Sequence, residues 1–137
     1  MTGPGAERSA RKRLWVAVIL AGTIALGLLS RRYPLPGILA EYTGDALYTS
    51  AGFGCLAFLF VRARTRSLAV AAFALSAAVE FAQLLSWPWL VDLRQTLCGR
   101  LVLGSGFKWP DMVAYSLGAM AAAAVDVALT RRHVCKA

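Results

Sequence analysis

One acidic residue, Glu80, lies inside a stretch that carries no other charge from residue 68 to residue 87. A carboxyl group in the middle of a membrane helix costs about 2.5 to 3.5 kcal/mol, so it must face protein, find hydrogen-bond partners or take up a proton. Helical spacing puts Ser76, Gln83 and Trp87 on the same face as Glu80. This polar stripe could bind a polar ligand, carry out acid–base chemistry or hold neighbouring helices together.

Two other apolar stretches begin with polar residues at similar spacing. Asp45 and Tyr48 open one of them, and Asp111 and Tyr115 open the other. Because all three stripes carry their acids toward the same end of a helical bundle, we expect them to form one outward-facing polar pocket. The candidate pocket residues are Asp45, Tyr48, Glu80, Gln83, Arg94, Asp111 and Tyr115.

Arg94 is the basic member of this set and lies in the segment 88–110. Its planar guanidinium could bridge Glu80 and Asp111, or hold a phosphate or carboxylate group that arrives from the outer leaflet. Simpler roles stay open for the same residues. Asp45 and Asp111 could only cap helix starts, and Glu80 with Gln83 could form a structural clasp.

The elements that must position these groups are membrane helices. The chain has 137 residues, 58% of them hydrophobic, and a mean hydropathy of +0.59, which is too apolar for an ordinary soluble domain. Four runs approach the roughly 17 to 25 residues that a bilayer helix needs. We predict an all-α four-helix bundle with spans at 14–30, 45–61, 68–87 and 111–129.

The chain has a net charge of +8, and its basic residues are distributed in a way that indicates the topology of the membrane helices. Most of the basic residues flank the spans on one side, which by the positive-inside rule is cytoplasmic. This predicts basic cytoplasmic tails at 1–13 and 131–137, a membrane domain at 14–130 and an outer loop at 88–110. It also disfavours nucleic acid as a partner. Asp126, near the cytoplasmic end, is expected to pair with Arg131 or Arg132.

No pattern in the sequence predicts a metal, a cofactor or a disulfide. Cys55, Cys98 and Cys135 show neither CxxC nor Cys/His ligand spacing. The small residues Gly52, Gly118 and Ala122 permit close helix packing, and the last two also offer a face for an oligomer.

Several short motifs together resemble a bacterial family, domain of unknown function family 2809, over most of the chain after residue 30. The motifs are Gly44-Asp45-Ala46-Leu47-Tyr48, Glu80-x-x-Gln83, Arg94, Leu103-Gly104-x-x-Phe107 and Asp111-x-x-x-Tyr115-x-x-Gly118. The chain is also similar, more distantly, to VanZ-like membrane proteins, which share the Glu-x-x-Gln, the Arg and the Asp. That similarity implies a cell-envelope role, with low-level glycopeptide resistance as the named phenotype. Neither resemblance assigns catalytic residues.

These observations favour a small bacterial inner-membrane protein whose pocket binds an envelope lipid headgroup or a lipid-linked precursor. A second hypothesis is a membrane-embedded enzyme in which Glu80 or Asp111 acts as acid or base and Arg94 steadies a phosphate. A third is a structural or assembly protein whose polar cluster only joins helices. Membrane lipids are the expected partners in all three.

Overall fold

The computed structural model describes residues 4–33, 36–103 and 106–134, and all of the regular elements in these ranges are helices. The elements in chain order are α1 (Pro4–Arg32), α2 (Ile38–Leu59), α3 (Thr65–Ala82), α4 (Pro88–Gln95), α5 (Leu97–Leu103) and α6 (Trp109–Val134). The four long helices contain most of the four predicted spans. The predicted all-α class is therefore confirmed for the residues that the structure describes.

The third helix is shorter than predicted. It ends at Ala82 rather than at residue 87. Pro88 restricts Trp87 to an extended backbone (φ −65°, ψ 134°) and begins a new helix, so the third helix could not have continued through residue 87. The guanidinium of Arg94 donates hydrogen bonds to the carbonyls of Ala82 and Gln83, where α3 ends. Trp87 thus precedes α4, and placing it on the polar stripe of the third span was wrong.

The predicted outer loop at 88–110 contains two short helices, α4 and α5. Thr96 separates them, and its Oγ1 accepts a hydrogen bond from the Gly99 N–H at 3.0 Å. A Cβ atom at Gly99 would lie 1.7 Å from the carbonyl oxygen of Leu93, so only glycine fits this sharp connection. Helices of this length show too few turns for a periodic hydrophobic pattern, which is why the sequence did not indicate them.

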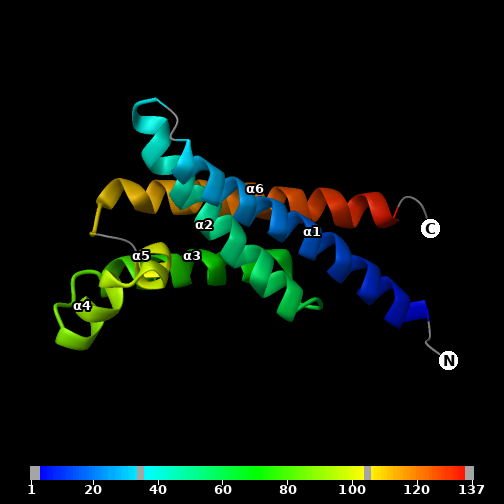
Figure 1. The fold of residues 1–137 in the computed structure, drawn as a ribbon. Helices are drawn as coiled ribbons and strands as arrows, with labels where there is room; N and C mark the ends of the chain where they lie inside the picture. Colours follow the sequence, from blue (N-terminus) through cyan, green and yellow to red (C-terminus); the bar gives the residue numbers. More distant parts are fainter. Residues whose placement is uncertain (1–3, 34–35, 104–105, 135–137) are drawn as a thin grey trace.

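α2 is the central helix of the bundle (Figure 1). It packs against α1, α3 and α6, and α6 also packs against α3. The first turns of α1, the α2–α3 connection and the last turns of α6 lie toward one end, on the right of Figure 1, whereas α4 and α5 lie at the opposite end. We call these the α2–α3 end and the α4–α5 end.

A close crossing joins α6 to α2 at Gly118. A Cβ atom there would lie 2.2 Å from the backbone oxygen of Ala46, and the Ser50 hydroxyl donates across the same crossing to the Gly118 carbonyl at 3.0 Å. Gly118 is therefore a packing residue, as expected. Gly52 is not, because a Cβ atom at this residue would meet nothing within 4 Å. An oligomer that used Gly118 would need a face that α2 covers in this bundle.

Three of the helices are long and apolar enough to cross a membrane: Lys12–Arg32, Thr65–Ala82 and Trp109–Leu129, among the residues described. α2 is not in this set, and it carries the polar residues Asp45, Tyr48, Thr49 and Ser50 around its middle. Many large apolar side chains face outward; Leu26 of α1 is 57% exposed and Val70 of α3 is 68% exposed. Exposure of this extent suits a hydrocarbon environment.

Candidate functional site: a buried carboxyl cluster

The Glu80 side chain is completely buried in the last turn of α3. Its Oε1 accepts the backbone N–H of Lys108 at 2.7 Å. Its Oε2 accepts the Tyr115 hydroxyl at 2.8 Å and the Gln83 side-chain amide at 3.2 Å. Each partner supplies a hydrogen, so the carboxylate is solvated by protein as it would be by water. We call Glu80, Gln83, Tyr115 and the Lys108 N–H the carboxyl cluster.

The cluster joins three segments that are distant in sequence. Glu80 and Gln83 come from the end of α3, Tyr115 from the second turn of α6, and Lys108 from the residue just before α6. Pro110 suits the first turn of α6, where a missing N–H costs nothing. The start of α6 is thereby fixed against the end of α3 at the α4–α5 end of the bundle.

One turn deeper along α3, the polar stripe continues to α2. Ser76 and Thr49 share a hydrogen bond of 2.9 Å between their hydroxyl oxygens, and Thr49 is completely buried. Ser76 lies one helical turn before Glu80, so the same face of α3 contacts α2 through Ser76 and α6 through Glu80. The sequence placed Ser76 on this stripe but did not pair it with Thr49.

Asp45 and Asp111 lie within electrostatic range of one member of the cluster, Tyr115. Both carboxylates, like Glu80, interact electrostatically with Tyr115, and Asp111 is 7% exposed. Tyr48, on the same face of α2 as Asp45, is partly buried. The structure therefore brings Glu80, Gln83 and Tyr115 into direct contact and places Asp45 and Asp111 within electrostatic range of Tyr115.

Arg94 has a different role from the one expected. Its hydrogen bonds go to the backbone carbonyls of Ala82 and Gln83, so it caps the C-terminus of α3, where the helix dipole favours a cation. Its Nε and the Oε1 of Gln83 are buried and have no hydrogen-bond partner among the described residues. One unsatisfied donor and one unsatisfied acceptor thus lie at the α3–α4 turn.

Sequence reasoning missed a second buried carboxylate contact, at the α2–α3 end. Asp126 of α6 accepts the Thr65 hydroxyl at 2.5 Å, and Lys12 Nζ lies 4.0 Å from its other oxygen. Asp126 therefore joins α6 to α3 and α1. The expected partners, Arg131 and Arg132, have side chains outside the described set. Its burial could not be read from the sequence, because Asp126 lies close to the end of the apolar run.

The fold and these contacts define a class of protein: an all-helical chain with three helices able to cross a membrane and a hydrogen-bonded carboxylate buried where two of them, α3 and α6, meet, over the residues described. A family model described as protein of unknown function (DUF2809) matches residues 34–119. The chain belongs to that family, which confirms the resemblance stated from its motifs. No solved structure matches the chain.

The matched segment contains the whole carboxyl cluster. It begins before α2 and ends one residue after Gly118, so it includes Thr49, Glu80, Lys108 and Tyr115 but omits α1 and the second half of α6. The contacts of Asp126 with Thr65 and Lys12 fall partly outside it. Among the described side chains, no three His, Cys, Asp or Glu residues are grouped to hold a metal ion.

Proposed function

We propose that the protein is a multi-pass bacterial inner-membrane protein that binds an envelope lipid headgroup, or a lipid-linked precursor, at its α4–α5 end. In this proposal α2 is a fourth span, and both termini are cytoplasmic. The polar residues of α2 that lower its hydropathy support this, because protein covers them: Thr49 is completely buried, and Ser50 donates to the Gly118 carbonyl of α6. A helix with polar groups covered in this way can still cross a bilayer.

Charge supports the proposed orientation. Arg62, Arg64 and Arg66 are exposed at the α2–α3 connection, which lies at the same end of the bundle as the start of α1. The positive-inside rule makes this the cytoplasmic end. The α4–α5 end then faces outward, where Trp87, Trp89 and Trp109 are more than half exposed, as suits side chains at a membrane–water interface.

One observation carries the headgroup proposal: the buried, unsatisfied Nε–H of Arg94 and Oε1 of Gln83, among the described residues. Leaving a buried donor or acceptor without a partner costs about 1 to 3 kcal/mol, so a polar group that satisfies both gains affinity. A phosphate oxygen would accept from Arg94, and a hydroxyl or amine beside it would donate to Gln83. Glycerophospholipid headgroups and lipid-linked sugar phosphates share this chemistry.

Within this proposal Glu80 positions other groups and does not touch the ligand. It holds the Gln83 amide, which turns the Gln83 carbonyl oxygen away from it, and it fixes the chain at Lys108. The enzyme hypothesis has less support for Glu80, because both of its carboxylate oxygens are engaged by donors of the protein. An acid or base must reach the proton that it transfers.

A second candidate function is purely structural, and the same contacts favour it. Three hydrogen bonds to a buried carboxylate are enough to explain why Glu80 is kept in the bundle. In that case Arg94 Nε and Gln83 Oε1 bind only water.

Lipid retention separates the two candidates. The parent protein, Arg94→Lys, Gln83→Met and the control Arg100→Lys would be purified gently, and their bound lipids identified by native mass spectrometry. Arg100 is exposed on α5, so its variant should behave as the parent does. We expect a phosphate-containing lipid on the parent and the control and several-fold less on the other two variants.

Each of the two site variants also serves as a control for the other. Gln83→Met leaves the helix-capping arginine in place, so loss in both variants is not explained by a damaged cap. A parent without bound lipid, or equal retention in all four proteins, would support the structural role.

A further inference from the structure

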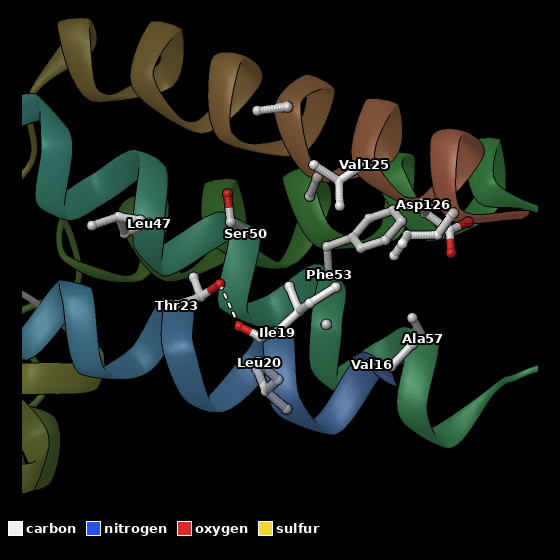
Figure 2. A pocket seen from close by; sticks show the side chains of 14 residues that line it. Val16, Ile19, Leu20, Thr23, Leu47, Ser50, Phe53, Ala57, Val125 and Asp126 are labelled. Atoms are coloured by element: carbon white, nitrogen blue, oxygen red, sulfur yellow. Dashed lines mark hydrogen bonds between the residues drawn. The ribbon is translucent and has the colours of Figure 1, made fainter. Parts of the chain in front are cut away.

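A groove runs between α1 and α6, with α2 as its floor (Figure 2). It encloses about 170 Å³ and lies toward the α2–α3 end, on a different side of the bundle from the carboxyl cluster. Within the described chain α1 packs along α2 and not along α6, so the groove separates α1 from α6. Its walls include Val16 and Leu20 of α1, Phe53 and Ala57 of α2, and Ala121 and Val125 of α6.

The few polar groups along the groove are already bonded inside the protein. The Thr23 hydroxyl donates to the Ile19 carbonyl at 2.8 Å, as Figure 2 shows, and the Ser50 hydroxyl donates to the carbonyls of Ala46 and Gly118. The hydroxyl hydrogens of Thr23 and Ser50 are therefore already used within the protein, and most of the lining is apolar. An apolar occupant is required by this lining.

The size of the groove suits a short segment of one hydrocarbon chain. Its volume of about 170 Å³ is close to that of an apolar cavity of about 150 Å³, which takes a molecule the size of benzene. Both walls belong to helices that can cross a membrane, so the groove opens toward the acyl chains of the bilayer. Small residues at positions 54, 57, 121 and 122 keep it open.

One end of the groove is charged. Asp126 lines it, and Lys12 Nζ lies 4.0 Å from the Asp126 carboxylate, with the Lys12 side chain 35% exposed. The Thr65 hydroxyl bonds the same carboxylate, which brings the exposed Arg64 and Arg66 to this end. The negative charge of Asp126 is thus already partnered, and the remaining field around it is positive.

We propose that this groove holds one acyl chain of an anionic phospholipid from the cytoplasmic leaflet, with the lipid phosphate against Lys12. The hydrocarbon fills the space between Val16, Phe53 and Val125, and the phosphate adds a second anionic partner for an ammonium group that is only loosely paired with Asp126. This site is formed by other residues than the headgroup site at Arg94 and lies in the other leaflet. It does not rest on the headgroup proposal.

Photo-crosslinking tests the groove directly. The full chain would be reconstituted in phosphatidylcholine bilayers that contain a small fraction of phosphatidylglycerol with a diazirine on its acyl chain, and labelled residues would be mapped by mass spectrometry. Ala121→Phe fills the groove. Ala124→Phe is the matched control, because Ala124 is likewise exposed on α6 but does not line the groove.

We expect labelling concentrated on groove residues of α1 and α6, lost several-fold in Ala121→Phe and kept in Ala124→Phe. The same probe built on phosphatidylcholine should label the groove less, and Lys12→Gln should remove that difference while Arg13→Gln keeps it. Labelling no stronger than at the lipid-facing Leu26, or equal labelling by both lipids, would each overturn the proposal. These measurements do not involve Arg94 or Gln83, so a negative result at the groove would not bear on the headgroup proposal, which lipid retention tests separately.

Discussion

The Tyr115 hydroxyl donates to Glu80 Oε2 at 2.8 Å, and this bond ties the second turn of α6 to the last turn of α3. The Lys108 N–H occupies the other carboxylate oxygen, and the Gln83 amide shares Oε2 with Tyr115. A buried charge is tolerated when donors replace its hydration, and Glu80 has three. The carboxyl cluster therefore stabilises one arrangement of α3, α6 and the chain that leads into α6.

Glu80→Gln should lower the melting temperature of the detergent-purified protein. A glutamine keeps one acceptor oxygen for the Lys108 N–H, and its NH₂ then faces the Gln83 amide and the Tyr115 hydroxyl, both of which donate to Glu80 in the parent protein and would have to turn or lose their hydrogen bonds. One unsatisfied buried donor costs about 1 to 3 kcal/mol, which corresponds to a fall of roughly 5 to 10 °C. Asp92→Asn, on the exposed face of α4, serves as the control and should change little. Equal or higher stability of Glu80→Gln would mean that Glu80 is kept at a cost for another purpose.

Tyr115→Phe should cost less than Glu80→Gln, about 1 to 2 kcal/mol in the free energy of unfolding, because the carboxylate keeps its bonds to Lys108 and Gln83. Tyr48→Phe is the matched control: Tyr48 is a partly buried tyrosine on α2. Denaturant titration of the two single variants and of Tyr115→Phe combined with Glu80→Gln gives the coupling between the pair. Additive losses would argue against a working bond between Tyr115 and Glu80.

Most side chains of the carboxyl cluster could be predicted from the sequence, but several of their hydrogen bonds could not. Glu80, Gln83 and Tyr115 stand out because polar residues at helical spacing in an apolar run must share a buried face. The Lys108 contact could not be predicted, since a backbone N–H has no sequence signature. The role of Arg94 depends on where α3 ends, and α3 ends at Ala82, before the apolar run does.

Fold prediction succeeded where the elements are long. The four long helices follow from apolar runs and charged flanks, whereas α4 and α5 are too short to show a period. Gly52 and Gly118 look alike in sequence because both lie on small-residue faces. Only the register of α2 against α6 decides which of them meets a backbone, and register depends on all of the contacts together.

Gly118→Ala should destabilise the bundle far more than Gly52→Ala. The added methyl at residue 118 would lie 2.2 Å from the Ala46 carbonyl oxygen, and backbone cannot yield without moving α6 away from α2. Overpacking of this kind costs about 1 to 3 kcal/mol or more. At Gly52 the space is open, and alanine should be neutral or stabilise the helix by about 0.5 to 1 kcal/mol. Melting temperatures of the two variants measure the difference, and similar values would argue against the close crossing.

Thr65 and Lys12 should contribute unequally to the stability that Asp126 provides. Lys12 is partly exposed and lies 4.0 Å from the carboxylate, so Lys12→Gln should cost less than about 1 kcal/mol. Thr65→Val and Asp126→Ala each break a 2.5 Å hydrogen bond at a buried oxygen, and should cost about 1 to 3 kcal/mol. Denaturant titration of the three variants tests the order. A larger loss for Lys12→Gln than for Thr65→Val would show that the ion pair, and not the hydroxyl, holds α6 at this end.

The proposed orientation predicts opposite labelling of two cysteines. Cys98 is exposed on α5 at the α4–α5 end, whereas Cys135 lies in the C-terminal tail, after the described residues. Each can be kept as the single thiol by replacing the other two cysteines with alanine. In spheroplasts a membrane-impermeant maleimide should react with Cys98 at once and with Cys135 only after lysis, because the thiol must meet the reagent in water. If Cys135 reacts in intact spheroplasts and Cys98 does not, the bundle is inverted. Labelling of both thiols without lysis would place both outside the cell membrane. The chain between Cys98 and Cys135 would then not cross the membrane once, as α6 does in this proposal. The orientation inferred from the positive-inside rule would be wrong.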